Sequence, residues 1–167
     1  MQTVSRSTLG LAAEYAVAAE LCRRNVYAQL TLGNQKRTDL LAFSETGQLV
    51  RLEVKGKQGR SWPSCRGISG RHSFLIFVDF AGKAVDARPD FYVLTSSDWR
   101  RVVKKRISEF RASNPRKRIK VDPDNVPIFV DEIGKSGKPH KGIAVRVDYL
   151  IRYQEKWNKV LRSLGAA

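Results

Sequence analysis

Cysteine, methionine and histidine are scarce in this chain of 167 residues, with two, one and two copies respectively. The two cysteines, Cys22 and Cys65, do not make a disulfide framework, and neither has the partner spacing of a zinc site. No apolar run approaches the length of a membrane span, and the N-terminus lacks the charged-then-apolar pattern of a signal peptide. These absences predict a protein of a reducing, cytoplasmic compartment with no membrane partner.

Acidic residues are the other shortage, because 16 Asp and Glu face 31 Lys and Arg, which gives a net charge of +15. The hydrophobic content of 42% is ordinary for a globular protein and argues against global disorder. The length suits one domain with a real core rather than two. So large a positive excess predicts a polyanionic partner, and nucleic acid is the first candidate. An acidic membrane surface is a weaker one, since no long segment combines a basic face with a bulky apolar stripe.

An alternating segment from Val50 to Lys55 carries apolar residues on one face and charged residues on the other, as a half-buried strand does. The run from Asp39 to Phe43 is also compatible with a strand, and turn-rich residues lie between the two. A tight antiparallel hairpin centred on Thr46 would place Asp39 directly opposite Glu53. Like charges so placed destabilise a sheet unless something offsets them, and carboxylate oxygens are ligands for divalent cations. The pattern therefore predicts a cation beside these two acids.

A first helix is expected from about Leu9 to Arg24, capped by Ser7 or Thr8. Glu14 falls on its apolar stripe, which should face the protein, whereas Glu20 lies over basic residues where a solvated salt bridge explains it. That stripe consists of Leu11, Val17, Ala18 and Leu21. A buried glutamate costs free energy without a partner. Glu14 therefore either joins a site or sits at the edge of a broad, weakly defined helix face.

The rest of the chain alternates strands and helices. Further strands are expected at Val26 to Leu32, at Ser73 to Phe80 and at Phe91 to Thr95, the second of them buried on both faces because it is almost wholly apolar. Polar, Gly-rich segments at 33–37 and 56–72 are expected as a turn and as a loop or short irregular helix. A second helix should run to about Arg111 from a cap at residues 96–98.

The end of the chain is less regular. Residues 114–141 are expected to form a basic, Pro- and Gly-rich excursion, partly mobile. Residues 143–147 look extended, and Asp148 could cap a final helix to about Leu164. This order predicts one α/β domain with a mixed central sheet flanked by helices, with its core at about 8–112 and 143–164 and the excursion at about 113–142.

Glu14, Asp39 and the tripeptide Glu53-Val54-Lys55 together resemble the motif of the PD-(D/E)XK nuclease superfamily, which has the restriction-endonuclease-like αβββ-β core. The resemblance covers Leu9 to roughly Leu94. It implies that Asp39 is the first acid, Glu53 the second acid, Lys55 the lysine and Glu14 the acid from the helix. Thr38 stands where the motif has proline, which many members also lack, and the short 56–72 segment stands where the family commonly has a helix.

The resemblance implies a Mg²⁺-dependent (or Mn²⁺-dependent) DNA endonuclease of resolvase, restriction or homing type, with a homodimer as the expected assembly. The metal would be held by Asp39, Glu53 and the Val54 carbonyl. Lys55 would orient or deprotonate water, or neutralise charge at phosphorus. A cross-strand ion pair on an exposed sheet face is the alternative explanation of the charged residues. A non-catalytic nucleic-acid-binding domain, or an RNA-associated basic protein, is the alternative for the whole chain.

Basic residues flank this site in sequence, as a phosphate-contacting rim would. The residues expected at the nucleic acid near the site are Arg37, Lys57, Gln58, Arg60, Trp62, Arg66 and Arg71, and those expected at the backbone farther away are Lys104, Lys105, Arg116, Lys117 and Arg118. Trp62 could stack on a base or wedge into a duplex, or it could pack on the domain's own surface. Gln58 could be an extra polar residue of the site or a solvated loop residue.

Overall fold

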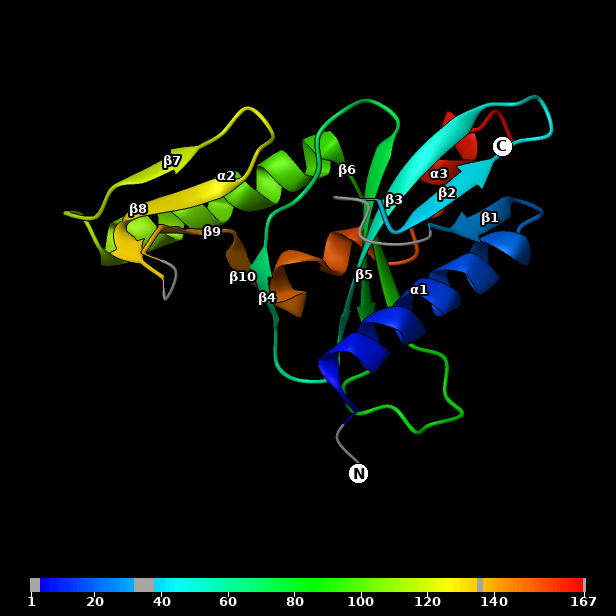
Figure 1. Ribbon diagram of the computed structural model, residues 1–167, viewed down its shortest axis with the longest axis horizontal. Helices are drawn as coiled ribbons and strands as arrows, with labels where there is room; N and C mark the ends of the chain where they lie inside the picture. Colours follow the sequence, from blue (N-terminus) through cyan, green and yellow to red (C-terminus); the bar gives the residue numbers. More distant parts are fainter. Residues whose placement is uncertain (1–3, 32–37, 135–136, 167) are drawn as a thin grey trace.

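A five-stranded mixed sheet forms the centre of the protein, seen in a computed structural model that describes residues 4–31, 38–134 and 137–166 (Figure 1). Its strands, in spatial order, are β1 (Tyr27–Leu30), β2 (Leu40–Phe43), β3 (Leu49–Lys57), β5 (Ser73–Asp79) and β6 (Asp90–Thr95). The β3–β5 pair is parallel and the other neighbours are antiparallel. The predicted mixed α/β class is confirmed.

The β2–β3 hairpin has the predicted register, with Phe43 opposite Leu49 and Leu41 opposite Arg51. The last formal pair is Leu40 with Leu52, one position before the acids. The Asp39 N–H donates to the Leu52 carbonyl at 2.9 Å, one position out of this register, so the predicted pairing of Asp39 with Glu53 does not form. Because β2 stops here while β3 runs on to Lys57, Asp39 lies where the sheet loses a strand.

Helices cover both faces of the sheet. α1 (Arg6–Cys22) and α3 (Asn158–Ser163) pack on one face, and α2 (Ser96–Ser113) packs on the other. Every residue of β5 is buried, as its apolar sequence predicts. Thr95 caps α2, and Asp98 completes a capping box with it. No helix in the described part of the chain is long and apolar enough to cross a membrane.

Residues 56–72, expected as a loop or short helix, contain a strand instead. β3 continues through Lys57, and β4 (Trp62–Cys65) pairs antiparallel with β10 (Ile143–Val145) on the α2 face of the central sheet. The apolar side chains of Trp62 and Cys65 point into this core, which a local reading of a Gly- and Arg-rich segment does not reveal.

The expected irregular excursion is a second small sheet, so that prediction is wrong. β7 (Ile119–Val121), β8 (Pro127–Ile133) and β9 (Pro139–Lys141) form an antiparallel sheet at one end of the molecule, beside α2 (Figure 1). Phe129 of β8 packs edge-on against Phe110 of α2, with ring centroids 5.0 Å apart. Two of the prolines that suggested a loop stand at the first position of a strand, where the missing N–H is tolerated.

The predicted helix from Asp148 to Leu164 is also wrong, because this segment has to serve both faces of the sheet. Two 3₁₀ turns, η1 (Val147–Tyr149) and η2 (Ile151–Tyr153), pack with α2, whereas α3 packs with α1. Between them Gln154 bridges to Tyr92 and Glu155 has a φ of 52°. A left-handed residue of this kind breaks a right-handed helix, so the crossing splits the element.

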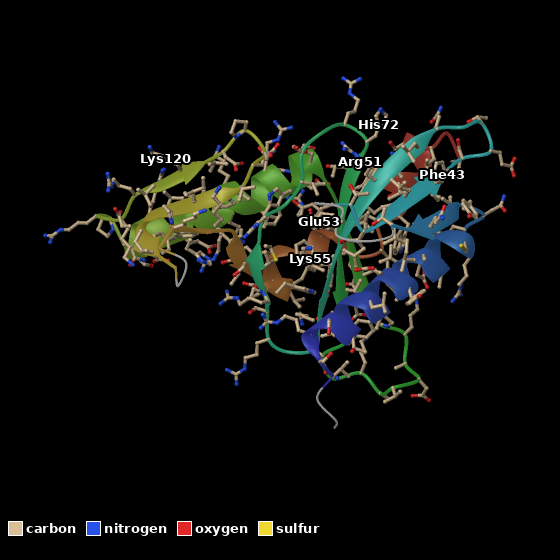
Figure 2. All side chains as sticks on the ribbon, viewed as in Figure 1. Phe43, Arg51, Glu53, Lys55, His72 and Lys120 are labelled. Carbon is tan, nitrogen blue, oxygen red and sulfur yellow. The ribbon has the colours of Figure 1, made fainter. Side chains whose placement is uncertain are left out.

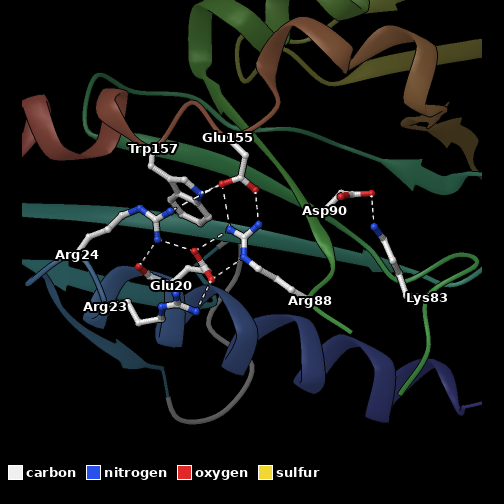
Figure 3. A network of polar contacts seen from close by, with 8 residues as sticks. All are labelled: Glu20, Arg23, Arg24, Lys83, Arg88, Asp90, Glu155 and Trp157. Carbon is white, nitrogen blue, oxygen red and sulfur yellow. Dashed lines mark hydrogen bonds and ion pairs between the residues drawn. The ribbon is translucent and has the colours of Figure 1, made fainter. Parts of the chain in front are cut away.

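Glu20 is buried rather than solvated, with 5% of its surface exposed. The helix begins at a Ser5 cap, and its buried residues are Ala13, Val17, Glu20 and Leu21, while Leu11 of the predicted stripe is 46% exposed. Besides its predicted contact with Arg24, the Glu20 carboxylate accepts two hydrogen bonds from Arg88 at 2.9 and 2.8 Å (Figure 3). Arg88 also holds Glu155, and its hydrogen bonds are the main reason that the pKa of Glu20 falls to about 2. The network ties α1 to two distant segments, which local sequence cannot show.

Candidate active site

The Asp39 side chain makes a hydrogen bond to β3 at a position where β2 has already ended. The Arg51 N–H donates to the His72 carbonyl on the β5 side, and the direction of these groups alternates along a strand. The N–H and the carbonyl of Val54 therefore point to the opposite edge, beyond the last residue of β2. There Asp39 Oδ2 accepts the Val54 N–H at 2.6 Å. The structure thus brings Asp39 and the main chain of Val54 together at an open edge of the sheet.

Glu53, the residue directly before Val54 on β3, is buried, with 5% of its surface exposed. Arg51, Glu53 and Lys55 follow one another along β3 (Figure 2). Glu53 Oε1 pairs with Lys55 Nζ at 2.9 Å, whereas Oε2 is buried and has no hydrogen-bond partner in the described part of the chain. A buried carboxylate oxygen without a partner costs free energy, and a hard cation is one group that can offset this cost. An ion pair on an exposed sheet face does not describe this geometry.

Lys55 carries a positive charge in this arrangement. Burial acts to lower its pKa, but the charge of Glu53 and the hydrogen bond to it outweigh burial, so that the pKa is raised. Asp39 adds to the same effect. The thiol of Cys65 lies near this pair, and burial raises its pKa to about 12, so it stays neutral. Of the roles expected for Lys55, stabilisation of negative charge fits this geometry better than deprotonation of water.

A cleft of about 580 Å³ opens beside these residues, between the first turns of α1, the end of β3 and the start of β4. Glu14, Asp39, Val54, Lys55 and Gln58 are among the residues that line it. The pKa of Glu14 is raised, first by burial and then by the charge of Asp39, with Lys55 opposing. The three acids and the lysine predicted as one site are therefore brought into one region.

Gly56 explains how Glu14 reaches this region. A Cβ at Gly56 would lie 2.9 Å from the Ala13 Cβ and 3.0 Å from the Leu9 carbonyl oxygen. α1 therefore approaches β3 as closely as it does because this position has no side chain. Sequence reasoning missed both this contact and Arg6, which lines the cleft from the first turn of α1. A glycine inside a strand, directly after the lysine, was the available signal.

Two residues expected at the nucleic acid are internal. Trp62 is 1% exposed, donates from Nε1 to the Val78 carbonyl at 3.2 Å and packs edge-on against Phe77. Lys57 is 5% exposed, pairs with Asp79 at 2.6 Å and lies over the Trp62 ring at 4.6 Å. The burial of both side chains contradicts their expected place at the nucleic acid, and for Trp62 it agrees with the alternative that the ring packs on the protein itself.

The other residues expected at the nucleic acid fall into distinct groups. Those exposed to solvent are Arg60, Arg66, Arg71, Lys104, Lys105 and Arg116. Lys117 and Arg118 are exposed too, but they pair with Glu132 and Asp131 at 2.9 and 2.8 Å. Gln58 is half-buried at the cleft. Arg37 lies outside the described residues.

The donors at the cleft suit a hard cation. No three His, Cys, Asp or Glu side chains within residues 4–31, 38–134 and 137–166 form a group that could hold a metal by themselves. Mg²⁺ keeps several waters and takes only one or two carboxylates, so this finding leaves room for it. Asp39 and Val54 line the cleft, and Glu53 Oε2 is buried on the same strand; all three offer oxygen, which is the donor type that Mg²⁺ and Mn²⁺ prefer.

Comparison with known proteins adds one likeness of fold. No family model matches the chain, and no curated protein matches it. A solved structure of a bacterial homing endonuclease, I-Ssp6803I, superposes with a TM-score of 0.45 at 18% identity, over 97% of this chain and 96% of that one.

Proposed function

We propose that this chain is a Mg²⁺-dependent (or Mn²⁺-dependent) DNA endonuclease that hydrolyses phosphodiester bonds. The observation that carries the proposal is Glu53 Oε2, a buried carboxylate oxygen without a partner. It belongs to the same strand as Lys55 and lies near the cleft that Asp39 and Glu14 line. The net charge of +15 also supports the proposal, since it favours a phosphate-bearing partner.

Asp39, Glu53 and the Val54 carbonyl would hold the metal ion. When bound, such an ion polarises a phosphoryl oxygen and lowers the pKa of a coordinated water. Lys55, held by Glu53, places an ammonium group at the cleft, where it can donate hydrogen bonds to the negative charge that builds up on the phosphoryl oxygens. Asp39 holds the Val54 N–H, which fixes the position of the Val54 carbonyl. Glu14 offers a carboxyl group from the other side of the cleft, where it can orient water.

Cleavage of both strands of a duplex by a chain with one such site calls for two copies, and we propose a homodimer on this ground. Sedimentation of the protein with and without duplex DNA tests it. A monomer in both conditions contradicts the dimer and leaves the site untouched.

Two substitutions test the function directly. Glu53→Gln and Asp39→Asn should abolish nicking of supercoiled plasmid in Mg²⁺, because each removes a carboxylate and keeps the shape of the side chain. Removing one essential electrostatic contact typically costs about 10²–10³ in rate. Glu45→Gln is the matched control, since Glu45 is an exposed acid of the β2–β3 turn.

Metal binding gives a readout that does not depend on activity. A ligand that binds only the folded state raises the melting temperature, so Mn²⁺ should stabilise the wild type and Glu45→Gln but not the two site variants. DNA binding without cleavage by the wild type, under any divalent cation, would instead support a nucleic-acid-binding domain that keeps the fold. Equal Mn²⁺ stabilisation of all four proteins would remove Asp39 and Glu53 from the metal site.

A further inference from the structure

A second groove, of about 560 Å³, runs along α2 on the side where the β7–β9 sheet packs. Its rim carries Arg100, Lys104 and Arg111 from α2, and Val103, Ile107 and Val121 are among the other residues that line it. None of the residues that line it is acidic. The groove therefore combines three positive charges with apolar surface.

The basic residues of α2 divide into two sets by their contacts. Arg101 pairs with Asp98, Arg106 lies 3.9 Å from Glu109, and Lys105 lies over the Tyr149 ring at 5.3 Å. In contrast, the side chains of Arg100 and Lys104 are exposed and make no hydrogen bond or ion pair within the described residues. Arg111 donates to the Ile119 carbonyl at 3.3 Å, which fixes its guanidinium beside β7. The unpaired charges of the helix thus face the groove.

The groove connects to the candidate active site through a short series of contacts. Asn125, at one end of the groove, accepts a hydrogen bond from Trp99 Nε1 at 3.0 Å, and its neighbour Asp124 accepts one from Ser69. Ser69 belongs to the segment that leads into β5. At the start of β5 Ser73 contacts Arg51, two residues before Glu53 on β3. Figure 2 shows Arg51 and Glu53 on the central sheet and Lys120 on the small sheet beyond this connection.

We propose that this groove, between α2 and β7, binds a backbone segment of the DNA substrate outside the cleavage site. The inference rests on the proposed function in taking DNA as the ligand. Arg100 and Arg111 are eleven positions apart on one helix, or about 16 Å at 1.5 Å per residue. That length spans about five nucleotides of one strand at 3.4 Å each. Phosphates meet the three cations of the rim, and sugars meet the apolar surface between them.

The test measures binding of labelled duplex DNA without divalent cations, so that cleavage plays no part. Arg100→Ala/Lys104→Ala should lower the slope of log affinity against log salt by about two, one for each phosphate contact removed. Arg152→Ala/Lys156→Ala is the matched control, because it removes two exposed positive charges outside the groove. Duplexes from about 8 to about 30 base pairs are compared, roughly 27 to 100 Å at 3.4 Å per pair. The affinity of Arg100→Ala/Lys104→Ala should equal that of the wild type for the shortest duplexes and should drop below it as the duplex becomes longer.

Equal salt slopes for the two double variants would overturn the proposal that the groove binds DNA. A groove variant that loses binding of poly-glutamate but keeps its binding of DNA would overturn the proposal too. Nicking of plasmid by the wild type in Mg²⁺ is scored separately. If the groove variant has a lower salt slope than the wild type and the wild type never nicks plasmid, the groove proposal is supported and the nuclease proposal is refuted. A slope that does not fall in a protein that nicks refutes the groove and leaves the nuclease standing.

Discussion

Glu20→Gln should destabilise the fold by about 3 kcal/mol at neutral pH. The pKa of Glu20 lies near 2 in the folded protein against 4.5 for the free group, chiefly because Arg88 donates hydrogen bonds to it. Lowering a pKa from 4.5 to about 2 stabilises the folded state by about 3 kcal/mol at neutral pH. A lowered folded-state pKa means that this stability is present above the unfolded pKa and is lost as pH falls toward 2. Glutamine keeps the shape of the side chain, removes the charge and replaces one of the two oxygens that accept from Arg88.

Thermal and urea unfolding from pH 7 down to about pH 2 provide the assay. At pH 7 a loss of about 3 kcal/mol lowers the melting temperature by roughly 6–12 °C for a chain of this size. The difference between variant and wild type should shrink as the pH falls, because wild-type Glu20 then becomes neutral too. Glu45→Gln, an exposed acid of the β2–β3 turn, should track the wild type throughout. A difference that stays constant from pH 7 to pH 2 would refute the electrostatic argument, and no difference at pH 7 would refute any role of the network in stability.

Two further substitutions test how the fold supports the site. Gly56→Ala should lower stability by about 1–3 kcal/mol and reduce nicking more than Gly10→Ala does, since only the first adds a methyl group against Ala13 and Leu9. Urea unfolding measures the stability of both variants, and plasmid nicking measures their activity. A Gly56→Ala protein with unchanged stability and nicking would contradict the close approach of α1 to β3. Trp62→Phe should cost about 1–3 kcal/mol, because the Val78 carbonyl loses its Nε1 donor, and should leave DNA affinity unchanged. A Trp62→Phe protein that has normal stability but binds DNA more weakly would instead indicate that Trp62 contacts DNA.

The hairpin register could be derived from sequence because a strand has a strict two-residue period and a tight turn fixes which residues face each other. That register brought Asp39 near the strand that carries Glu53, although the two residues do not pair directly, and their expected roles came from the resemblance to a nuclease motif. Lys55 needed only the alternation of one strand, and Glu14 needed the period of one helix. Each of these inferences depends on residues that are near in sequence.

The errors share a different origin. Trp62 is buried because β4 pairs with β10, about eighty residues away in the chain, a number that follows from Ile143 opposite Cys65. Glu20 is buried because Arg88 reaches it from the β5–β6 connection. The segment around Trp62 is polar and looks solvated until β10 covers it, and Glu20 beside Arg23 and Arg24 looks solvated until Arg88 reaches it. The prediction of one C-terminal helix is wrong for a related reason, since the apolar side chains of this segment pack first on one face of the sheet and then on the other.

Asp39 joins the end of a strand to the chemistry of the site, and this has an evolutionary consequence. Its Oδ2 atom holds the Val54 amide where β2 has stopped, so the same carboxylate that would bind a metal also fixes the strand carrying Glu53 and Lys55. Under the proposed function, a descendant that abandoned cleavage would still be selected for a hydrogen-bond acceptor at this position. Asparagine is therefore the change that such a lineage could accept most easily, and its appearance in place of Asp39 would mark a protein that has kept the architecture after losing the reaction.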